Sequence, residues 1–330
     1  MTVSGTPAAQ PTRSTPPAPS SGDGAVHGLR HVIREVATDI KLAHSVFALP
    51  FALLGAMMAA APVGSPVGSS VDWRRLAGQL VLVVLAMIFA RTAAMLANRL
   101  LDHRIDARNP RTASRAIPSG RLPVRAAVVA MALNAVAFML VCAGFGVLFA
   151  NWWPLILGMP VLVWICAYGI FKRFTALCHV YLGSGLALSP LAAAIAVDPA
   201  ALAQPALWLV SLMVLCWVAG FDVIYALQDV EVDRAERLYS MPSRLGVPTA
   251  MRISRALHGV AVMSLIVAGW VDPRFGWLFA MGVACVAGLL LYEHATVARW
   301  GTTKLALAFF TLNGILSCLL GSLAILDLLI

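Results

Sequence analysis

Long apolar blocks alternate with short polar connections along most of the chain, and this alternation is its main pattern. Nine of the blocks approach or exceed the about 20 residues that an α-helix needs to cross a membrane. We therefore predict an all-α membrane protein, a bundle of nine transmembrane helices. The predicted spans are 41–61, 77–101, 124–148, 153–171, 177–197, 205–227, 251–270, 275–296 and 304–328.

The first 40 residues do not follow this pattern. Residues 1–30 consist largely of Pro, Ser, Thr, Ala and Gly and hold few large apolar side chains, so they cannot bury a core. We predict a disordered N-terminal tail over 1–30. Residues 31–40 are predicted to form a short amphipathic helix on the membrane surface. The intramembrane domain is accordingly predicted over 31–330.

Composition and charge exclude a soluble domain and indicate how the bundle is oriented. The chain is 60% hydrophobic and 12% charged, with a mean hydropathy of +0.85 and a net charge of +9. The basic residues lie between apolar blocks and not on one polar surface, so we expect no nucleic-acid partner. Most of the 24 Lys and Arg residues fall in alternate connections, whereas the opposite ones hold only Arg74, Arg75 and Arg274. By the positive-inside rule, the N-terminus faces the cytoplasm in a multi-pass cytoplasmic (inner) membrane protein.

A polar cluster stands at the end of the second predicted span. Asn98, Asp102 and Asp106 are spaced i, i+4 and i+8. On a helix they fall within about 80° of one another and therefore share one face. Carboxylates at the mouth of a membrane helix are costly without a cationic partner, so we expect a cation to meet them.

A second acidic cluster follows more than a hundred residues later, again at the end of an apolar block. Asp222, Asp229 and Asp233 are spaced i, i+7 and i+11, which also predicts a shared helical face. Paired acidic faces of this kind suit Mg²⁺, which binds one or two carboxylates and leaves its other positions to water and phosphate oxygens. A basic connection containing Pro-Ser follows each cluster. This weak internal repeat would place the clusters opposite each other across one cavity.

Arg91 lies inside the second predicted span, seven residues before Asn98. On a helix it is about 20° from Asn98 and two turns deeper. An arginine at that depth is costly unless a carboxylate reaches it or it lines a wet cavity. It either neutralises a neighbouring aspartate or binds the carboxylate of an aromatic acid, and we favour the second interpretation. Asp222 stands in the same relation to Asp229, and either holds a basic residue or orients the hydroxyl of the acceptor.

Two longer stretches resemble a known family. NRLLDHRIDARNPRTASRAIPSGR (98–121) is similar to the first aspartate-rich motif, NxxxDxxxD, of the UbiA superfamily of intramembrane prenyltransferases, and DVIYALQDVEVDRAERLYSMPSRLG (222–246) resembles its second. The resemblance covers roughly residues 38–330. HSVFALPFALLGA (44–56) and YGIFKRFTALCH (168–179) are most similar to the 4-hydroxybenzoate polyprenyltransferase branch and its menaquinone-pathway relative acting on dihydroxynaphthoate.

The resemblance implies a Mg²⁺-dependent prenyltransferase of ubiquinone or menaquinone biosynthesis. Its substrates would be a polyprenyl diphosphate, taken from the lipid bilayer, and a small aromatic acid of the 4-hydroxybenzoate type. The expected catalytic residues and metal ligands are Asn98, Asp102, Asp106, Asp229 and Asp233. The expected substrate-binding residues are Arg91, Asp222, Lys172, Arg173, Arg115 and Arg244. Arg244 is included because Leu238-Tyr239-Ser240-Met241 lacks the basic residue that the family often has there.

The chemistry explains this set of residues. Carboxylates alone would repel a diphosphate, whereas Mg²⁺ held by both clusters bridges them to it and stabilises the leaving group as the allylic C–O bond breaks. Lys172, Arg173 and Arg115 would take the remaining phosphate charge. The allylic cation must meet a ring carbon before it meets water, so we expect a dry cavity closed by the 103–123 and 228–250 connections.

Three alternatives stay open. The same fold can use another acceptor: 1,4-dihydroxy-6-naphthoate, 1,4-dihydroxy-2-naphthoate, a porphyrin or a lipid alcohol. A secondary transporter would place acidic groups near mid-membrane, whereas these gather at one rim. A lipid-binding scaffold without turnover would give no reason for two metal-spaced faces. The sequence leaves prenyl chain length and oligomeric state open, and no obligate protein partner is evident.

Overall fold

The structure is a computed structural model that describes residues 28, 30–32, 34–38, 47–61, 71–304 and 311–330. Most of the predicted N-terminal tail lies outside these residues, as do parts of the first and ninth predicted spans. Within the described residues all regular structure is helical, which confirms the predicted class. The α-helices are α2 (Leu49–Ala60), α4 (Trp73–Asp106), α5 (Val124–Phe149), α6 (Trp153–Cys166), α7 (Tyr168–Phe171), α8 (Cys178–Val197), α9 (Pro205–Tyr225), α10 (Val230–Ala235), α11 (Met241–Leu245), α12 (Val247–Val271), α13 (Trp277–Trp300) and α14 (Asn313–Leu329). Three 3₁₀ segments join them: η2 (Pro199–Ala203), η3 (Ala226–Asp229) and η4 (Gly301–Lys304).

Seven helical stretches of the described chain are long and apolar enough to cross a membrane. The shorter apolar helices α2 and α14 coincide with the first and ninth predicted spans and adjoin residues outside the described range. The fold is therefore that of a multi-pass membrane protein and is compatible with nine spans. The described positions between 30 and 38 are helical, as predicted for the surface segment.

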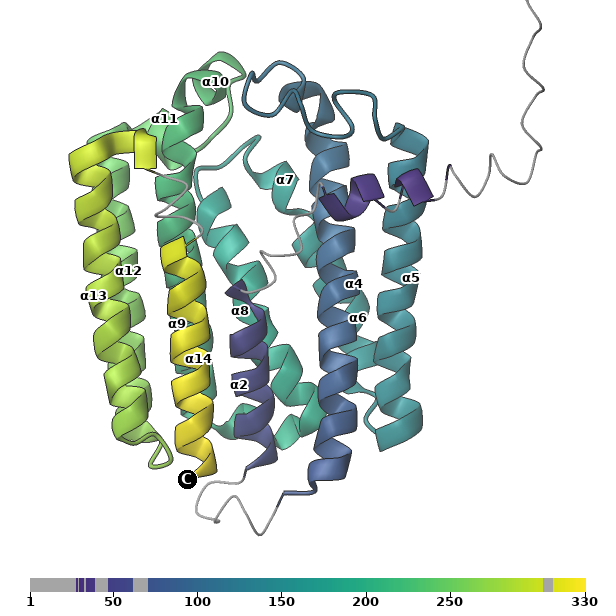
Figure 1. Cartoon of the computed structure of the whole chain (residues 1–330), viewed down its shortest axis with the longest axis vertical. Coiled ribbons are helices and arrows are strands. Elements are labelled where there is room, and N and C mark those ends of the chain that lie inside the picture. Colours follow the sequence, from purple (N-terminus) through teal and green to yellow (C-terminus); the bar gives the residue numbers. More distant parts are fainter. Residues whose placement is uncertain (1–27, 29, 33, 39–46, 62–70, 305–310) are drawn as a thin grey trace, which may run out of the picture.

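The long helices run roughly parallel in one bundle (Figure 1). Helices α7, α10 and α11 and the connection 107–123 gather at one end, where both aspartate clusters lie. The α5–α6 and α12–α13 connections lie at the opposite end. Both clusters are thus on the same side of the bundle, as the charge pattern predicted.

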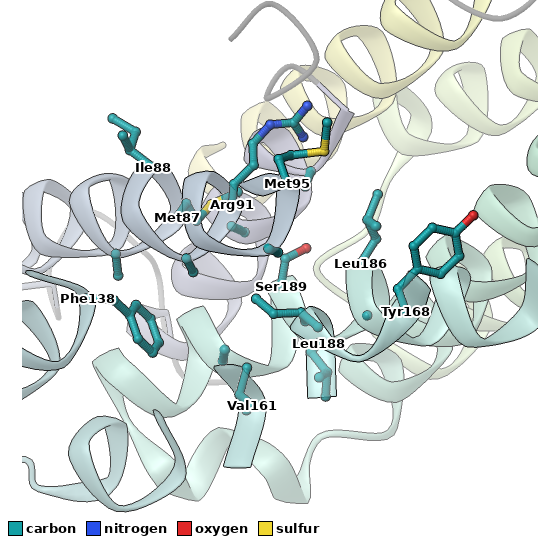
Figure 2. A pocket seen from close by; sticks show the side chains of 18 of the residues that line it. Met87, Ile88, Arg91, Met95, Phe138, Val161, Tyr168, Leu186, Leu188 and Ser189 are labelled. Carbon is teal, nitrogen blue, oxygen red and sulfur yellow. The ribbon is translucent and has the colours of Figure 1, made fainter. Parts of the chain in front are cut away.

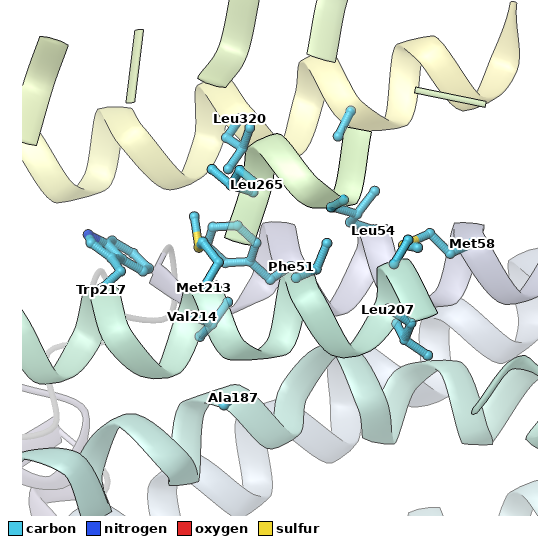
Figure 3. Close-up of a cluster of buried hydrophobic side chains, with 14 of the residues drawn as sticks. Phe51, Leu54, Met58, Ala187, Leu207, Met213, Val214, Trp217, Leu265 and Leu320 are labelled. Atoms are coloured by element: carbon cyan, nitrogen blue, oxygen red, sulfur yellow. The ribbon is translucent and has the colours of Figure 1, made fainter. Parts of the chain in front are cut away.

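Helix α9 is the most enclosed of the long helices, with 15 of its 21 residues buried. Trp217, Met213 and Leu207 on α9 are completely buried and pack against α2, α12 and α14 (Figure 3). The Trp217 ring meets Phe51 of α2 edge-on at 5.5 Å between centroids. The second aspartate cluster begins at the end of this helix, so it is attached to the most tightly packed element of the fold.

Small residues allow neighbouring helix backbones to approach closely, as is common in membrane bundles. A Cβ at Gly55 of α2 would lie 2.2 Å from the carbonyl oxygen of Pro190 in α8. A Cβ at Gly183 of α8 would lie 2.3 Å from the carbonyl oxygen of Leu215 in α9. Side chains are excluded at both points, and α8 is thereby packed tightly between α2 and α9.

Arg274 closes the end of the bundle opposite the aspartates. Its buried guanidinium pairs with Asp272 at 2.6 Å and donates to Gln204 Oε1 at 2.8 Å. It also donates to the carbonyl oxygens of Met58, at 3.0 Å, and Ala61. One side chain thus ties the α12–α13 connection to the end of α2 and the start of α9.

We expect Arg274→Met to lower the free energy of unfolding by about 3 kcal/mol, because it leaves Asp272 buried without its partner. Thermal unfolding in detergent measures this change. The activity of the remaining folded protein should be unchanged, since Arg274 is at the far end from the aspartates. Arg74→Met, an exposed arginine at the same end, is the control. Equal unfolding temperatures for the two variants would contradict a stabilising role for Arg274.

Candidate functional site

A cavity of about 1070 Å³ lies among α2, α4, α5, α6 and α8 (Figure 2). Much of its wall is apolar and includes Met87, Phe138, Val161 and Leu188. Much of the polar lining comes from α4, from the connection 107–123 and from the end of α9, and Glu35, Tyr168 and Ser189 add to it. Its main polar members are Arg91, Asn98, Arg111, Arg115 and Asp222. A largely apolar space that also presents charged groups suits an amphipathic molecule.

Helix α4 is continuous from Trp73 to Asp106, so it presents Arg91 and Asn98 to the same cavity, as predicted. The helix ends at Asp106, three residues before Asn109-Pro110. A proline disfavours the α conformation of the residue before it, so the helix does not continue through Asn109. Asp102 and Asp106 are 3% and 5% exposed. Carboxylates buried this deeply require positively charged partners.

Three of the predicted phosphate-binding residues are these partners. Lys172 Nζ pairs with Asp102 Oδ2, and Arg173 Nη2 lies 3.5 Å from Asp102 Oδ1. Arg115 Nη1 bridges both oxygens of Asp106, at 2.7 and 2.8 Å. The predicted basic and acidic residues are therefore brought together beside Asn98 and Arg115, which line the cavity.

The second cluster departs from the prediction of one shared helical face. Helix α9 ends at Tyr225 and continues as the 3₁₀ segment η3 before α10 begins. A 3₁₀ helix turns about 120° per residue where an α-helix turns about 100°, so four residues add roughly 80° of rotation. Asp222 consequently lines the cavity, whereas Asp229 faces the connection 107–123.

Asp229 is held by two residues of that connection. Arg111 Nη2 lies 2.5 Å from Oδ2, Arg111 Nε lies 3.0 Å from Oδ1, and Asn109 Nδ2 donates to Oδ1 at 3.0 Å. Burial alone would lower the pKa of the Arg111 guanidinium, but the hydrogen bond to Asp229 and its charge outweigh burial and raise that pKa. The connection that follows the first motif thus binds Asp229 of the second motif and holds the two motifs together.

Sequence reasoning missed Arg111 and Asn109, because it explained most arginines of this connection by membrane topology alone. The missed signal was their position: Asn109 is three and Arg111 five residues after Asp106, in the connection that faces the second aspartate motif. Bidentate Arg–carboxylate pairing of this kind fixes geometry as well as charge.

Two of the remaining predicted residues, Asp233 and Arg244, do not line the cavity. Asp233 is half-buried on α10, and its carbonyl oxygen accepts from the Leu238 N–H at 2.7 Å. Arg244 stacks on the Tyr239 ring at 3.7 Å and is not among the residues that line the cavity.

The oxygen atoms of the first motif fit a divalent metal. Asn98 Oδ1 and Asp102 Oδ1 are buried one turn apart without a hydrogen-bond partner in the described chain. Nowhere in that part of the chain do three His, Cys, Asp or Glu side chains form a metal cage by themselves. Hard oxygen donors from one or two carboxylates, with the other positions left to water or phosphate, match the preference of Mg²⁺.

Arg91 is half-buried in the cavity wall, and its buried Nε has no hydrogen-bond partner among the described residues. No acidic side chain in the described ranges forms an ion pair with it. The interpretation that Arg91 neutralises a neighbouring aspartate therefore receives no support.

Comparison with known proteins gives a consistent family. The model of the UbiA prenyltransferase family matches residues 48–324. The 4-hydroxybenzoate octaprenyltransferase of Nitrosomonas europaea is 29% identical over 247 residues, which cover 72% of this chain and 78% of that protein. The enzyme of the same name from Saccharophagus degradans is 30% identical over 219 residues, 65% of this chain and 69% of that protein.

Solved structures agree in fold. A UbiA homolog from Aeropyrum pernix K1, in its apo form, superposes with a TM-score of 0.72 at 28% identity, covering 86% of this chain and 98% of that one. A UbiA homolog from Archaeoglobus fulgidus, bound to GPP and Mg²⁺, superposes with a TM-score of 0.62 at 16% identity over 90% of this chain and all of that one. This multi-pass membrane protein therefore belongs to the UbiA prenyltransferase family and is a prenyltransferase.

Proposed function

We propose that this enzyme transfers a polyprenyl group from a polyprenyl diphosphate to a small aromatic acid, in a quinone-forming pathway. The observation that carries the proposal is one largely apolar cavity whose wall holds Arg91, with no hydrogen-bond partner for its Nε among the described residues. Asn98 and Arg115 also line this cavity, and the ion-paired Asp102 and Asp106 lie beside them. The relatives named 4-hydroxybenzoate octaprenyltransferase support the acceptor class. The cavity mouth and the N-terminus face the cytoplasm, by the charge asymmetry of the connections.

The mouth of the cavity receives the diphosphate. Lys172, Arg115 and Arg111 donate hydrogen bonds to carboxylates in the free enzyme and have the charge and geometry to donate to phosphate oxygens instead. Asn98, Asp102, Asp106, Asp229 and Asp233 would hold Mg²⁺, which when bound supplies the positive charge that stabilises the leaving diphosphate. The Archaeoglobus fulgidus homolog, solved with GPP and Mg²⁺, supports this assignment.

The apolar part of the cavity takes the polyprenyl tail and excludes water. Its wall is formed largely by apolar side chains such as Phe138, Phe145 and Val161, which hold no water by hydrogen bonds. An allylic cation formed at the mouth therefore meets the acceptor ring and not a water molecule. The new carbon–carbon bond forms beside the acceptor hydroxyl, and the ring then loses its proton.

The acceptor is held at two points. The Arg91 guanidinium binds its carboxylate, and Asp222 accepts a hydrogen bond from its ring hydroxyl. Both 4-hydroxybenzoate and 1,4-dihydroxy-6-naphthoate carry these two groups. A porphyrin or a lipid alcohol does not present them in this arrangement, so an aromatic acid is the preferred class.

The test is incubation of the purified protein with labelled polyprenyl diphosphates of several lengths and a panel of acceptors, beginning with 4-hydroxybenzoate and 1,4-dihydroxy-6-naphthoate. We expect a prenylated acid in the presence of Mg²⁺ and less than a tenth of that rate in EDTA, restored by excess Mg²⁺. Product mass and position of the new bond are read by mass spectrometry and NMR. Absence of product with every acid, or full turnover in EDTA, would contradict the proposal.

A further inference from the structure

His179 is a buried residue at which three elements of the site meet. It is the second residue of α8 and is 3% exposed. Its Nδ1 lies 2.7 Å from Asp222 Oδ2 at the end of α9, and its Nε2 accepts the Met241 N–H of α11 at 3.2 Å. Because a backbone N–H only donates, Nε2 carries the lone pair and Nδ1 carries the proton. The neutral ring therefore donates to Asp222 at one end and accepts from the second-motif connection at the other.

Further contacts hold that connection beside His179. The Tyr239 N–H donates to the Lys172 carbonyl oxygen at 2.7 Å, and Cys178 Sγ lies 3.5 Å from the Tyr239 carbonyl oxygen. Lys172 in turn reaches Asp102 through its side chain. The turn between α7 and α8 thus touches the diphosphate end of the site and the segment that follows Asp233.

We infer that His179 is a positioning residue for both substrates of the proposed reaction. By donating to one oxygen of Asp222, it fixes that carboxylate so that the other oxygen remains an acceptor for the aromatic hydroxyl in the cavity. By accepting from Met241, it holds the connection after the second aspartate motif against α8. The role of the Asp222 contact depends on the proposed function. The role of the Met241 contact requires only that the enzyme binds a prenyl diphosphate.

Two substitutions separate the two contacts. His179→Asn places an amide nitrogen near the position of Nδ1, so it keeps the donor to Asp222 and loses the acceptor for Met241. His179→Gln places an amide oxygen near the position of Nε2, so it keeps the acceptor for Met241 and loses the donor to Asp222. A residue with a purely structural role would not give opposite kinetic effects in this pair.

We expect His179→Gln to raise the KM of the aromatic acid about tenfold, with the KM of the diphosphate within about twofold of wild type. We expect His179→Asn to raise the KM of the diphosphate about fivefold and to leave that of the acid nearly unchanged. His258 provides matched controls. It is equally buried and also bonds at both ring nitrogens, to Trp217 and His294, but it does not line the cavity. His258→Asn and His258→Gln should leave both KM values within about twofold.

Parallel increases of both KM values in the two His179 variants would overturn the inference. A double-mutant cycle covers a His179 variant with impaired folding: in an Asp222→Asn background, His179→Gln should change the acid KM no further, and additive effects would contradict positioning through Asp222. If the wild-type enzyme prenylates no aromatic acid, the proposed function fails. Diphosphate binding to the Asn and Gln variants then tests the Met241 contact, and equal affinities would overturn it.

Discussion

Asp102→Asn and Asp229→Asn should each reduce prenyl transfer on the order of a thousandfold while the protein still inserts and folds. Asparagine keeps the shape of each side chain and removes its charge. The proposed Mg²⁺ ligand set would lose a carboxylate, and Lys172 or Arg111 would lose its buried anionic partner. Loss of transfer, with unchanged elution in size-exclusion chromatography, measures the effect.

Asp198→Asn is the matched control for these variants. Asp198 lies at the opposite end of the bundle, where its side chain accepts from the Ala200 N–H and lines no part of the cavity. Its activity should equal that of wild type. The Mg²⁺ concentration for half-maximal rate gives a second readout, and it should rise sharply wherever Asp102→Asn or Asp229→Asn retains residual activity. Full activity at ordinary Mg²⁺ in either site variant would remove the metal-holding role.

The ion pairs of the described aspartates also indicate which contacts must be exchanged when the diphosphate binds. Asp102, Asp106 and Asp229 are each paired with a lysine or arginine. These pairs satisfy buried charge in the free protein and hold the motifs in place. Binding of a diphosphate with its metal would exchange the partners, the cations moving to phosphate oxygens and the carboxylates to the metal. The ion pairs therefore pre-organise the site, and their strength opposes substrate binding.

Much of this arrangement could be predicted from sequence because it depends on local patterns. Membrane-length apolar blocks define the helices, and the distribution of basic residues places both aspartate clusters at one end. Arg91 and Asn98 share a cavity because one uninterrupted helix carries both. Their seven-residue spacing is enough to specify that relation.

The remaining features depend on pairing between distant parts of the chain. Arg111 and Asp229 are 118 residues apart, and His179 and Asp222 are 43 apart, so no local periodicity reports their contacts. The change from α-helix to 3₁₀ at Ala226 also escapes an apolar pattern that is equally consistent with a straight helix. In the sequence Arg274 resembles an ordinary loop charge, although its buried side chain joins the α12–α13 connection to the end of α2 and the start of α9.

Arg91→Ala should raise the KM of the aromatic acid about a hundredfold and leave the KM of the diphosphate within about threefold, since a buried charge pair loses one member. Its Nε has no partner in the described chain, and it lines the cavity two turns below Asn98. Arg252→Ala, an exposed arginine on α12, should change neither value.

Neutral acceptors distinguish carboxylate recognition from a general loss of fit at Arg91. Wild-type enzyme should prefer 4-hydroxybenzoate over its amide or methyl ester by at least about tenfold, because only the acid forms a bidentate pair with a guanidinium. In Arg91→Ala that preference should disappear, with the acid falling to the rate of the neutral analogues. Arg91→Lys should restore part of the preference, since it returns the charge without the fork. If the variant discriminates against the neutral analogues as strongly as wild type does, the carboxylate is bound elsewhere, and Arg91 does not determine which acceptor the enzyme selects.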